Sequence, residues 1–310
     1  MNINVENIVK KINIRGTVRL KEPMKLHTSF KIGGPADIYA RPLDLKDLSA
    51  LVSLVREEDV PCFILGGGAN ILVSDRGIRG IVIDMSGFSD IHREETRLIC
   101  GAGAAVSEVS GRAAAEGLSG LEFIYRMPGS LGGALWMNAR CYGRSIGEIP
   151  GWVDVLTSDL SEKRIYLSTG DFSYKKSPFQ KIDAILIRAC FELKYDKPEL
   201  IRGRMEEVEK DRRDKGHFAH PSAGSVFKND HSFGRPTGVI LERLGLRGMR
   251  HGAAQIAPYH ANIIINTGDA RAEDVAFLIA YAKEEAYKKE GFVLDPEIRF
   301  IGDWDYGRSS

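Results

Sequence analysis

The sequence feature that most constrains this chain is a run of three glycines, Gly66, Gly67 and Gly68, between two short apolar stretches. The apolar residues 63–65 and 71–73 on either side predict a strand, a backbone turn and a second strand. Glycine has no Cβ, so the peptide N–H groups of such a turn are open to a phosphate. We therefore expect a phosphate-bearing ligand here. The alternative is a glycine hairpin that binds nothing.

Neither of the two common phosphate-binding patterns fits this chain. Residues 66–71 lack the third glycine of the dinucleotide fingerprint and continue into a strand-like sequence, and residues 101–106 fail at the same position. No Gly-x-x-x-x-Gly-Lys-Ser/Thr loop occurs. A second glycine-rich segment, residues 128–139, has glycines where the N-terminus of a helix could meet an anion. The ligand must therefore be held by a different arrangement.

Composition limits the class of protein and its partners. With 310 residues, of which 43% are hydrophobic, the chain can form a large core and two or three domains. A net charge of +1 gives no reason to expect a nucleic-acid partner. No apolar run reaches the ~18 residues of a membrane span, and the N-terminus lacks the apolar core of a signal peptide, so we expect no membrane insertion.

Cysteine and histidine spacing argue against a metal centre. The four cysteines, at positions 62, 100, 141 and 190, include no Cys-x-x-Cys pair, which argues against a disulfide framework and a zinc knuckle. The histidines at 217, 220 and 231 match no metal-binding spacing. We expect a cytoplasmic protein without a bound metal.

Hydrophobic periodicity predicts alternating helices and strands. Apolar residues recur at helical spacing from residue 45, with Asp44 as the N-cap, and again from 106 to 117 and from 272 to 290. A charged helix from 199 to about 215 marks a domain boundary, and a short helix is expected at 238–244. Strands are expected at 37–41, 80–84, 152–157, 164–168, 184–193, 261–266 and 297–301.

Five motifs, in this order, resemble the UDP-N-acetylenolpyruvoylglucosamine reductase (MurB) family. They are His-Thr-Ser-Phe-Lys-Ile-Gly-Gly at 27–34, Leu-Gly-Gly-Gly-Ala-Asn at 65–70, Pro-Gly-Ser-Leu-Gly-Gly at 128–133, Ser-Ala-Gly-Ser-Val-Phe-Lys-Asn at 222–229 and Asp-Pro-Glu-Ile-Arg-Phe-Ile-Gly at 295–302. The resemblance runs from about residue 27 to residue 302. Chain length and the first motif indicate the shorter, type II form of the family.

The resemblance implies an α+β fold of the FAD-binding PCMH type, with two FAD-clasping α/β subdomains and a C-terminal α+β substrate-binding domain. The expected divisions are 1–86, joined by a C-terminal strand at 298–310, then 87–197 and 198–297. The implied reaction is NADPH-dependent, FAD-mediated reduction of UDP-N-acetyl-3-O-(1-carboxyvinyl)-glucosamine to UDP-N-acetylmuramate, in peptidoglycan precursor synthesis. A monomer that binds this UDP-sugar is expected.

We interpret the two glycine-rich segments, residues 66–70 and 129–133, as binding the FAD pyrophosphate from two sides. The positions that the resemblance assigns to FAD binding are Leu65, Gly66, Gly67, Gly68, Ala69, Asn70, Ser74, Gly129, Ser130, Gly132, Gly133 and Asn138.

The resemblance also implies the catalytic residues. Ser225 matches the proton donor of the family, and Glu297 matches a glutamate that polarises the enol or orients a proton relay. Without the resemblance, Ser225 would be a loop hydroxyl that caps a turn, and Glu297 would form a surface cross-strand pair with Arg299. A serine hydroxyl is a weak acid and needs a preorganised pocket to donate its proton.

One catalytic position departs from the family. In the family this position is an arginine that follows a tyrosine, whereas this chain has Lys175 there. A planar guanidinium can donate two hydrogen bonds to a carboxylate, and a lysine ammonium is a point charge. Our hypothesis is that Lys175 replaces the arginine functionally. Arg126 and Arg140 are the other cations that could take this role.

The diphosphate of the substrate requires positive charge in the third division. The candidates are Arg212, Lys215, Lys228 and Asn229, and the charge run that ends at Lys215 could instead be a solvated helix face. Two alternative functions stay open: another PCMH-fold FAD oxidoreductase, which would not need the pairing of Ser225 with Glu297, and a non-catalytic nucleotide-sugar binding protein.

Overall fold

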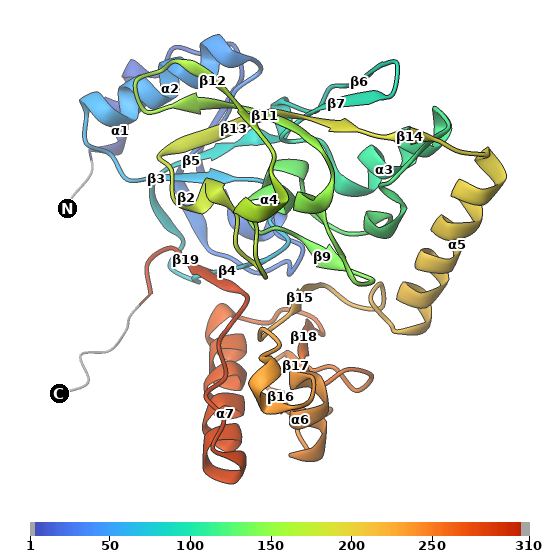
Figure 1. The fold of residues 1–310 in the computed structure, drawn as a ribbon. Coiled ribbons are helices and arrows are strands. Elements are labelled where there is room, and N and C mark those ends of the chain that lie inside the picture. Colours follow the sequence, from blue (N-terminus) through green and yellow to red (C-terminus); the bar gives the residue numbers. More distant parts are fainter. Residues whose placement is uncertain (1–3, 305–310) are drawn as a thin grey trace. The chain divides into compact units, whose positions relative to one another are not determined.

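The computed structural model describes residues 4–304, which form two compact units (Figure 1). Unit 1 comprises Met1–Leu20, Ile38–Gly67 and Gly80–Asp211, and unit 2 comprises Lys21–Asp37, Gly68–Arg79 and Arg212–Ser310. Each unit is therefore assembled from three separate stretches of chain. Residues 305–310 of the predicted C-terminal strand lie outside the described residues, and the three-part division stays a prediction.

Three helices begin at residues 45, 106 and 272, where the apolar spacing predicts them. The helices that begin in unit 1 are α1 (Val5–Lys11), α2 (Leu45–Glu57), α3 (Val106–Ala115), α4 (Leu131–Trp136) and α5 (Pro198–Asp214). Unit 2 contains α6 (Thr237–Arg243) and α7 (Ala272–Glu290). Asp44 caps α2 as predicted, because its side chain accepts a 3.0 Å hydrogen bond from the Asp47 N–H.

The first sheet lies mainly in unit 1. Its strands are ordered β1 (Thr17–Pro23), β2 (Pro35–Arg41), β5 (Ile78–Asp84) and β3 (Cys62–Leu65), and β3 runs parallel to β5. Side chains of α1 and α2, among them Ile8 and Leu48, pack in one core with Ile81 and Ile83 of β5. The predicted strand–helix–strand order is confirmed, and β5 lies between the two strands.

The second sheet of unit 1 is antiparallel. Its order is β12 (Glu162–Tyr166), β11 (Gly151–Thr157), β13 (Ala184–Glu192), β7 (Arg97–Gly101) and β6 (Ile91–Glu94). Helices α3 and α4 share a core with this sheet through buried residues that include Val109, Leu135 and Phe191. Two small antiparallel pairs complete the unit: β8 (Leu118–Ser119) with β14 (Lys194–Tyr195), and the hairpin of β9 (Arg140–Cys141) with β10 (Arg144–Ser145).

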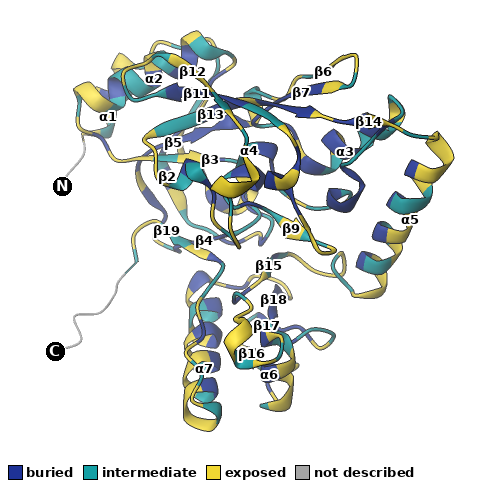
Figure 2. Ribbon diagram, in the orientation of Figure 1, coloured by how far each residue is buried: buried dark blue, intermediate teal, exposed yellow. Residues whose placement is uncertain are grey.

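Unit 2 contains a four-stranded antiparallel sheet, ordered β15 (Ser222–Ser225), β18 (Ile263–Asn266), β17 (Ala254–Ile256) and β16 (Arg250–His251). A parallel pair joins β4 (Ile71–Val73) to β19 (Arg299–Ile301). One core takes Phe30, Leu72 and Leu278 from the three stretches of the unit. Buried and exposed residues alternate along α7, as expected for a helix with one face on this core (Figure 2).

The glycine-hairpin alternative is wrong, because the two strands that flank the glycines do not pair with each other. β3 pairs with β5, and β4 pairs with β19.

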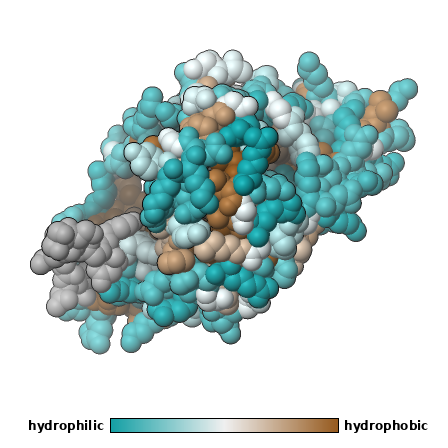
Figure 3. All heavy atoms as spheres, turned by 90° about the horizontal axis from the view of Figure 1, so that it is seen from below, coloured by the Kyte–Doolittle hydropathy of each residue, from teal (hydrophilic) through white to brown (hydrophobic). Residues whose placement is uncertain are grey.

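Seen from below, the surface is mainly hydrophilic with apolar atoms in smaller areas (Figure 3). Within residues 4–304, no helix is both long and apolar enough to cross a membrane.

Candidate functional site

The predicted site residues divide between the two units, and each group is described within its own unit. Unit 1 contains Leu65, Gly66, Gly67, Gly129, Ser130, Gly132, Gly133, Asn138 and Lys175. Unit 2 contains Gly68, Ala69, Asn70, Ser74, Arg212, Lys215, Ser225, Lys228, Asn229 and Glu297.

In unit 1 the two glycine-rich segments touch. The Gly67 N–H donates a 3.0 Å hydrogen bond to the Ser130 hydroxyl, which also accepts from the Gly133 N–H at 3.3 Å as the N-cap of α4. A Cβ on Gly67 would lie 2.5 Å from the Gly129 Cα. Glycine is therefore required here for close approach of the two segments, a reason that the local sequence could not supply.

This contact changes which N–H groups a phosphate could use. The expectation that all three glycines of the run keep open donors is wrong for Gly67, whose N–H is occupied by Ser130. Gly132 likewise donates to the Ala102 carbonyl at 2.7 Å. Within residues 4–304, no hydrogen bond from the peptide N–H groups of Gly66, Gly129 or Ser130 is present. These donors, placed where the two segments meet, suit a phosphate.

Lys175 lies at the tip of a tight turn. Ser173 and Lys176 exchange two backbone hydrogen bonds, at 3.1 and 3.0 Å, which leaves Tyr174 and Lys175 as the two turn residues. Lys175 has a φ of 58°, a backbone conformation that costs energy for a residue other than glycine. The Gln180 side-chain amide donates to its carbonyl at 3.1 Å. The turn is thus held in a fixed conformation.

Asn138, just after α4, supports this turn. The residue is only 3% exposed. Its Nδ2 donates to the Ser173 carbonyl at 2.8 Å, and its Oδ1 accepts from the Gly147 N–H at 3.1 Å. Both polar groups of the amide are therefore bonded within unit 1. This predicted cofactor residue links the end of the second glycine-rich segment to the Lys175 turn.

The two arginines considered beside Lys175 have other partners. Arg126 forms an ion pair with Glu209 of α5, with 3.1 Å between Nη2 and Oε1, and its guanidinium lies over the Tyr125 ring. Arg140 is exposed and donates to the Gly143 carbonyl at 3.3 Å within the β9–β10 pair.

In unit 2 the segments around Ser225 and Glu297 run side by side. The Glu297 N–H donates to the Val226 carbonyl at 2.7 Å, the Lys228 N–H donates to the Asp295 carbonyl at 3.0 Å, and Phe227 and Pro296 form an antiparallel bridge. Two motifs that are remote in the sequence therefore become neighbours.

Two details of the sequence prediction around these residues are wrong. Ser225 is the last residue of strand β15 and not part of a loop, because β15 pairs with β18 through a register shift where Gly224 has a φ of 73°. The closing strand begins at Arg299, so Glu297 precedes it and the two do not share a strand face. The Glu297 backbone pairs with Val226 instead.

The turn residues Gly68 and Asn70 are bonded within unit 2. The Asn70 Nδ2 donates to the Glu297 carbonyl at 3.1 Å, and its own carbonyl accepts from the Arg299 N–H at 3.1 Å. Gly68 has a φ of 60° and accepts a hydrogen bond from the Ser29 N–H. The predicted cofactor turn is thus attached to the segment that carries Glu297.

The predicted substrate residues have partners inside unit 2. The Lys228 ammonium lies 2.6 Å from an Asp295 carboxylate oxygen, and the Asn229 Oδ1 accepts from the Thr237 N–H at 2.9 Å near the start of α6. Arg212 is only 8% exposed, so the alternative of a solvated helix face is wrong for this residue. The hydroxyl of Ser74, predicted to bind the cofactor, donates to the Asp303 carbonyl at 2.6 Å.

The structure adds Asn262, which sequence reasoning missed. It is buried immediately before β18, and its amide bonds to both backbone groups of Phe227, two residues after Ser225. The available signal was an asparagine within the apolar stretch 261–265, because a polar side chain in a buried strand needs a specific partner.

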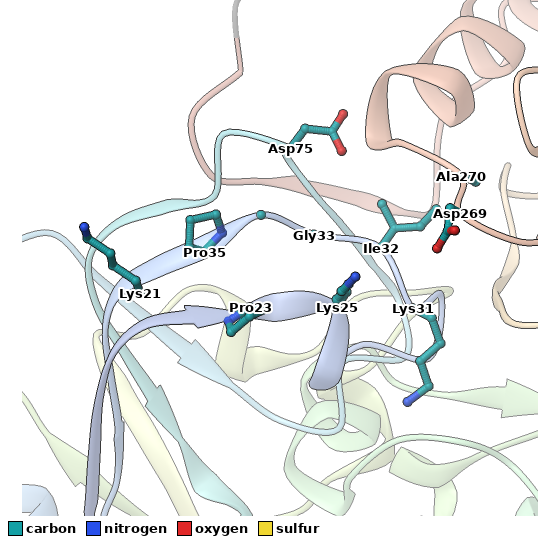
Figure 4. A pocket seen from close by; sticks show the side chains of 11 residues that line it. Lys21, Pro23, Lys25, Lys31, Ile32, Gly33, Pro35, Asp75, Asp269 and Ala270 are labelled. Carbon is teal, nitrogen blue, oxygen red and sulfur yellow. The ribbon is translucent and has the colours of Figure 1, made fainter.

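A hollow of about 490 Å³ lies elsewhere in unit 2 (Figure 4). Lys21, Lys25, Lys31, Asp75 and Asp269 are among the residues that line it. None of the predicted site residues lines it, and Figure 4 shows that the three lysine side chains do not converge on one point.

Comparison with known proteins gives two family matches along the chain. Residues 36–159 match the FAD binding domain family. Residues 216–301 match the family described as UDP-N-acetylenolpyruvoylglucosamine reductase, C-terminal domain.

Whole-chain relatives agree with these matches. The UDP-N-acetylenolpyruvoylglucosamine reductase of Caldanaerobacter subterraneus subsp. tengcongensis is 40% identical over 297 residues, which cover 95% of this chain and 97% of that protein. The protein of the same name from Treponema denticola is 39% identical, with 93% and 95% covered. The crystal structure of the Thermus caldophilus reductase superposes with a TM-score of 0.77 at 31% identity and covers 93% of this chain and 100% of that one.

Proposed function

The chain belongs to the UDP-N-acetylenolpyruvoylglucosamine reductase family, and on this premise we propose that it reduces UDP-N-acetyl-3-O-(1-carboxyvinyl)-glucosamine to UDP-N-acetylmuramate, a step of peptidoglycan precursor synthesis. The fold is α+β, with an FAD-binding domain of the PCMH type and the C-terminal domain of this family. The observation that carries the proposal is the pairing of the Ser225 segment with the Glu297 segment in unit 2.

FAD is the cofactor, and the residues present suit its pyrophosphate. Unit 1 offers the peptide N–H groups of Gly66, Gly129 and Ser130, which can donate to phosphate oxygens without an intervening side chain. When bound, FAD would supply the chemistry of hydride transfer, from NADPH to the enolpyruvyl methylene carbon of the substrate. NADPH as the hydride donor is part of the proposal.

The residues of the chain would manage charge and a proton. As the methylene carbon gains a hydride, negative charge develops on the neighbouring carbon and its carboxylate. The Lys175 ammonium would stabilise this charge from its fixed turn. The Ser225 hydroxyl, oriented by Glu297, would donate its proton to the neighbouring carbon on which the charge develops. This protonation would give the lactyl ether.

Binding of the uridine diphosphate would use the basic residues of unit 2. The positive charge would come from Arg212, Lys215 and Lys228. Asn229, the residue after Lys228, would contribute its side-chain amide. Because Lys228 is held 2.6 Å from Asp295, a phosphate would have to compete with that carboxylate. Because Lys228 is assigned to substrate binding and not to the chemical step, Lys228→Ala should raise KM for the UDP-sugar with little change in kcat.

We also propose a cytoplasmic monomer without a nucleic-acid partner. All four cysteines lie in the described part of the chain and are free thiols, as in proteins of a reducing compartment. The net charge of +1 supports the absence of nucleic-acid binding. Cell fractionation and sedimentation of the purified holoenzyme would test compartment and oligomeric state.

The decisive experiment is anaerobic reduction of the purified yellow protein by NADPH, followed by addition of the enolpyruvyl UDP-sugar. The proposal expects bleaching of the flavin colour by NADPH and its return with this substrate. Return of colour with simple alcohols would indicate another FAD oxidoreductase. A flavin that NADPH does not bleach, in a protein that still binds the UDP-sugar, would indicate a binding protein without turnover.

A further inference from the structure

We propose that Asn262 is a positioning residue for the proton donor Ser225, an inference that rests on the reductase function proposed above. Asn262 is 3% exposed. Its Oδ1 accepts a hydrogen bond from the Phe227 N–H at 2.9 Å, and its Nδ2 donates to the Phe227 carbonyl at 2.8 Å. One side chain thus holds both backbone hydrogen-bonding groups of a residue in the catalytic segment.

The Asn262 backbone continues this contact. Its carbonyl accepts from the Val226 N–H at 2.8 Å, while the Val226 carbonyl accepts from the Glu297 N–H at 2.7 Å on the other side. Asn262 is itself fixed, because its own N–H donates to the His260 Nδ1 at 3.1 Å. The residue that follows Ser225 is therefore clamped between Asn262 and Glu297.

Strand pairing gives Ser225 a single partner, Ile263 of β18, because the register shifts between Ser222 and Ser225. Ser225 is exposed at the end of β15. A weakly acidic hydroxyl donates a proton only from a well-defined position, and small displacements of a catalytic group are costly. The hydrogen bonds of Asn262 with Val226 and Phe227 fix the backbone that follows Ser225, and so the position of its hydroxyl.

The chemistry of this clamp is specific to an amide. One oxygen acceptor and one N–H₂ donor can satisfy both groups of a single peptide residue. In the present structure the Asn262 Nδ2 lies 2.8 Å from the Phe227 carbonyl oxygen. An aspartate at position 262 would keep the acceptor but put a carboxylate oxygen in the place of Nδ2, where it would repel that carbonyl oxygen. A leucine of similar size would satisfy neither group.

The test separates the two half-reactions of the holoenzyme. The bound FAD is reduced with dithionite, the enolpyruvyl UDP-sugar is added without air, and the return of flavin colour is timed. We expect Asn262→Asp to slow this return by on the order of ten- to a hundred-fold, with the rate of flavin reduction by NADPH unchanged. Should Asn262→Asp fail to fold, Asn262→Ser is measured with the same expectation.

Asn266→Asp is the matched control. Asn266 is 4% exposed in β18, and its amide bonds to the Phe30 carbonyl and to the N–H groups of Gly268 and Ala270, away from Ser225. The control should lose thermal stability and keep the wild-type rate of colour return. A readout independent of activity is hydrogen exchange: in Asn262→Leu the Phe227 amide should exchange faster than in the wild type, and in Asn266→Asp it should not.

Three results would overturn the role of Asn262. They are a wild-type rate of colour return in Asn262→Asp, equal slowing of both half-reactions, and equal slowing by Asn266→Asp. If the wild-type enzyme itself fails to regain colour with the UDP-sugar, the proposed function is wrong instead.

Discussion

The side-chain amide of Asn70 donates a 3.1 Å hydrogen bond to the carbonyl of Glu297, a residue 227 positions later in the chain. This bond attaches the predicted cofactor turn to the predicted catalytic segment within unit 2. Asn70→Ala removes the donor and leaves a partly buried carbonyl without it. We expect the free energy of unfolding to fall by about 1–3 kcal/mol, measured by urea denaturation with FAD in excess. An unchanged midpoint would show that water replaces the amide without cost.

The contact between Gly67 and Gly129 predicts the effect of a single methyl group. In Gly67→Ala the new Cβ would lie 2.5 Å from the Gly129 Cα, so the two glycine-rich segments must separate. We expect loss of bound FAD, measured as flavin absorbance per protein after gel filtration, and the larger Gly67→Val should retain none.

A second glycine provides the control for this substitution. Gly111 lies inside α3, and a Cβ there meets no atom within 4 Å. Gly111→Ala should keep the full FAD content and raise stability by roughly 0.5–1 kcal/mol, because alanine suits a helix interior better than glycine. Full FAD retention in Gly67→Ala would show that the segments can move apart freely.

Lys175 is predicted to stabilise charge during turnover. Lys175→Ala should lower kcat by at least about ten-fold, because the developing carboxylate charge loses its cation. Lys175→Arg should retain or exceed the wild-type rate, since a guanidinium can bind a carboxylate bidentately. The neighbouring Lys176→Ala changes the charge equally and serves as the control. Unchanged turnover in Lys175→Ala would return the role to Arg126 or Arg140.

Asp154 gives a prediction for the pH dependence of stability. Burial alone would raise the pKa of this carboxyl, but hydrogen bonds from Arg164 and Arg188 outweigh it and hold the pKa below its ordinary value. A lowered pKa stabilises the fold above the ordinary value of about 3.9, and this contribution disappears as the pH falls through the lowered pKa.

Asp154→Asn should therefore be less stable than the wild type near neutral pH, and the difference should shrink below about pH 4. Urea denaturation of both proteins at neutral and acidic pH measures this difference in the free energy of unfolding. A difference that stays constant over this range would mean that packing, and not the charge of Asp154, accounts for the loss.

Local sequence patterns predicted the elements but not their contacts. The periodicity of apolar residues predicted α7 at its observed bounds, and the charged segment from residue 199 predicted α5 within one residue of its ends. Both succeed because helix formation depends on residues within two turns. The bond from Gly67 to Ser130 spans 63 positions and that from Phe227 to Asn262 spans 35. Such pairs are set by packing and register between distant segments, which no local pattern encodes.

The family resemblance supplied site residues that periodicity could not. It singled out Ser225 and Glu297, and the structure places their segments side by side. It could not reveal the support of the Lys175 turn by Asn138, or the internal partner of the Gly67 N–H, because both depend on side-chain geometry. Those contacts decide which donors remain for a ligand.

The parallel pairing of β4 with β19 has a consequence for how this protein can be recombined with its relatives. The residues that match the C-terminal domain family, 216–301, include β19 but neither β4 nor the core residues Phe30 and Leu72. A chimera that exchanges only those residues would combine a strand from one parent with its partner from another. Residues 216–301 are therefore not the unit that folds together. A functional chimera must exchange all three stretches of unit 2.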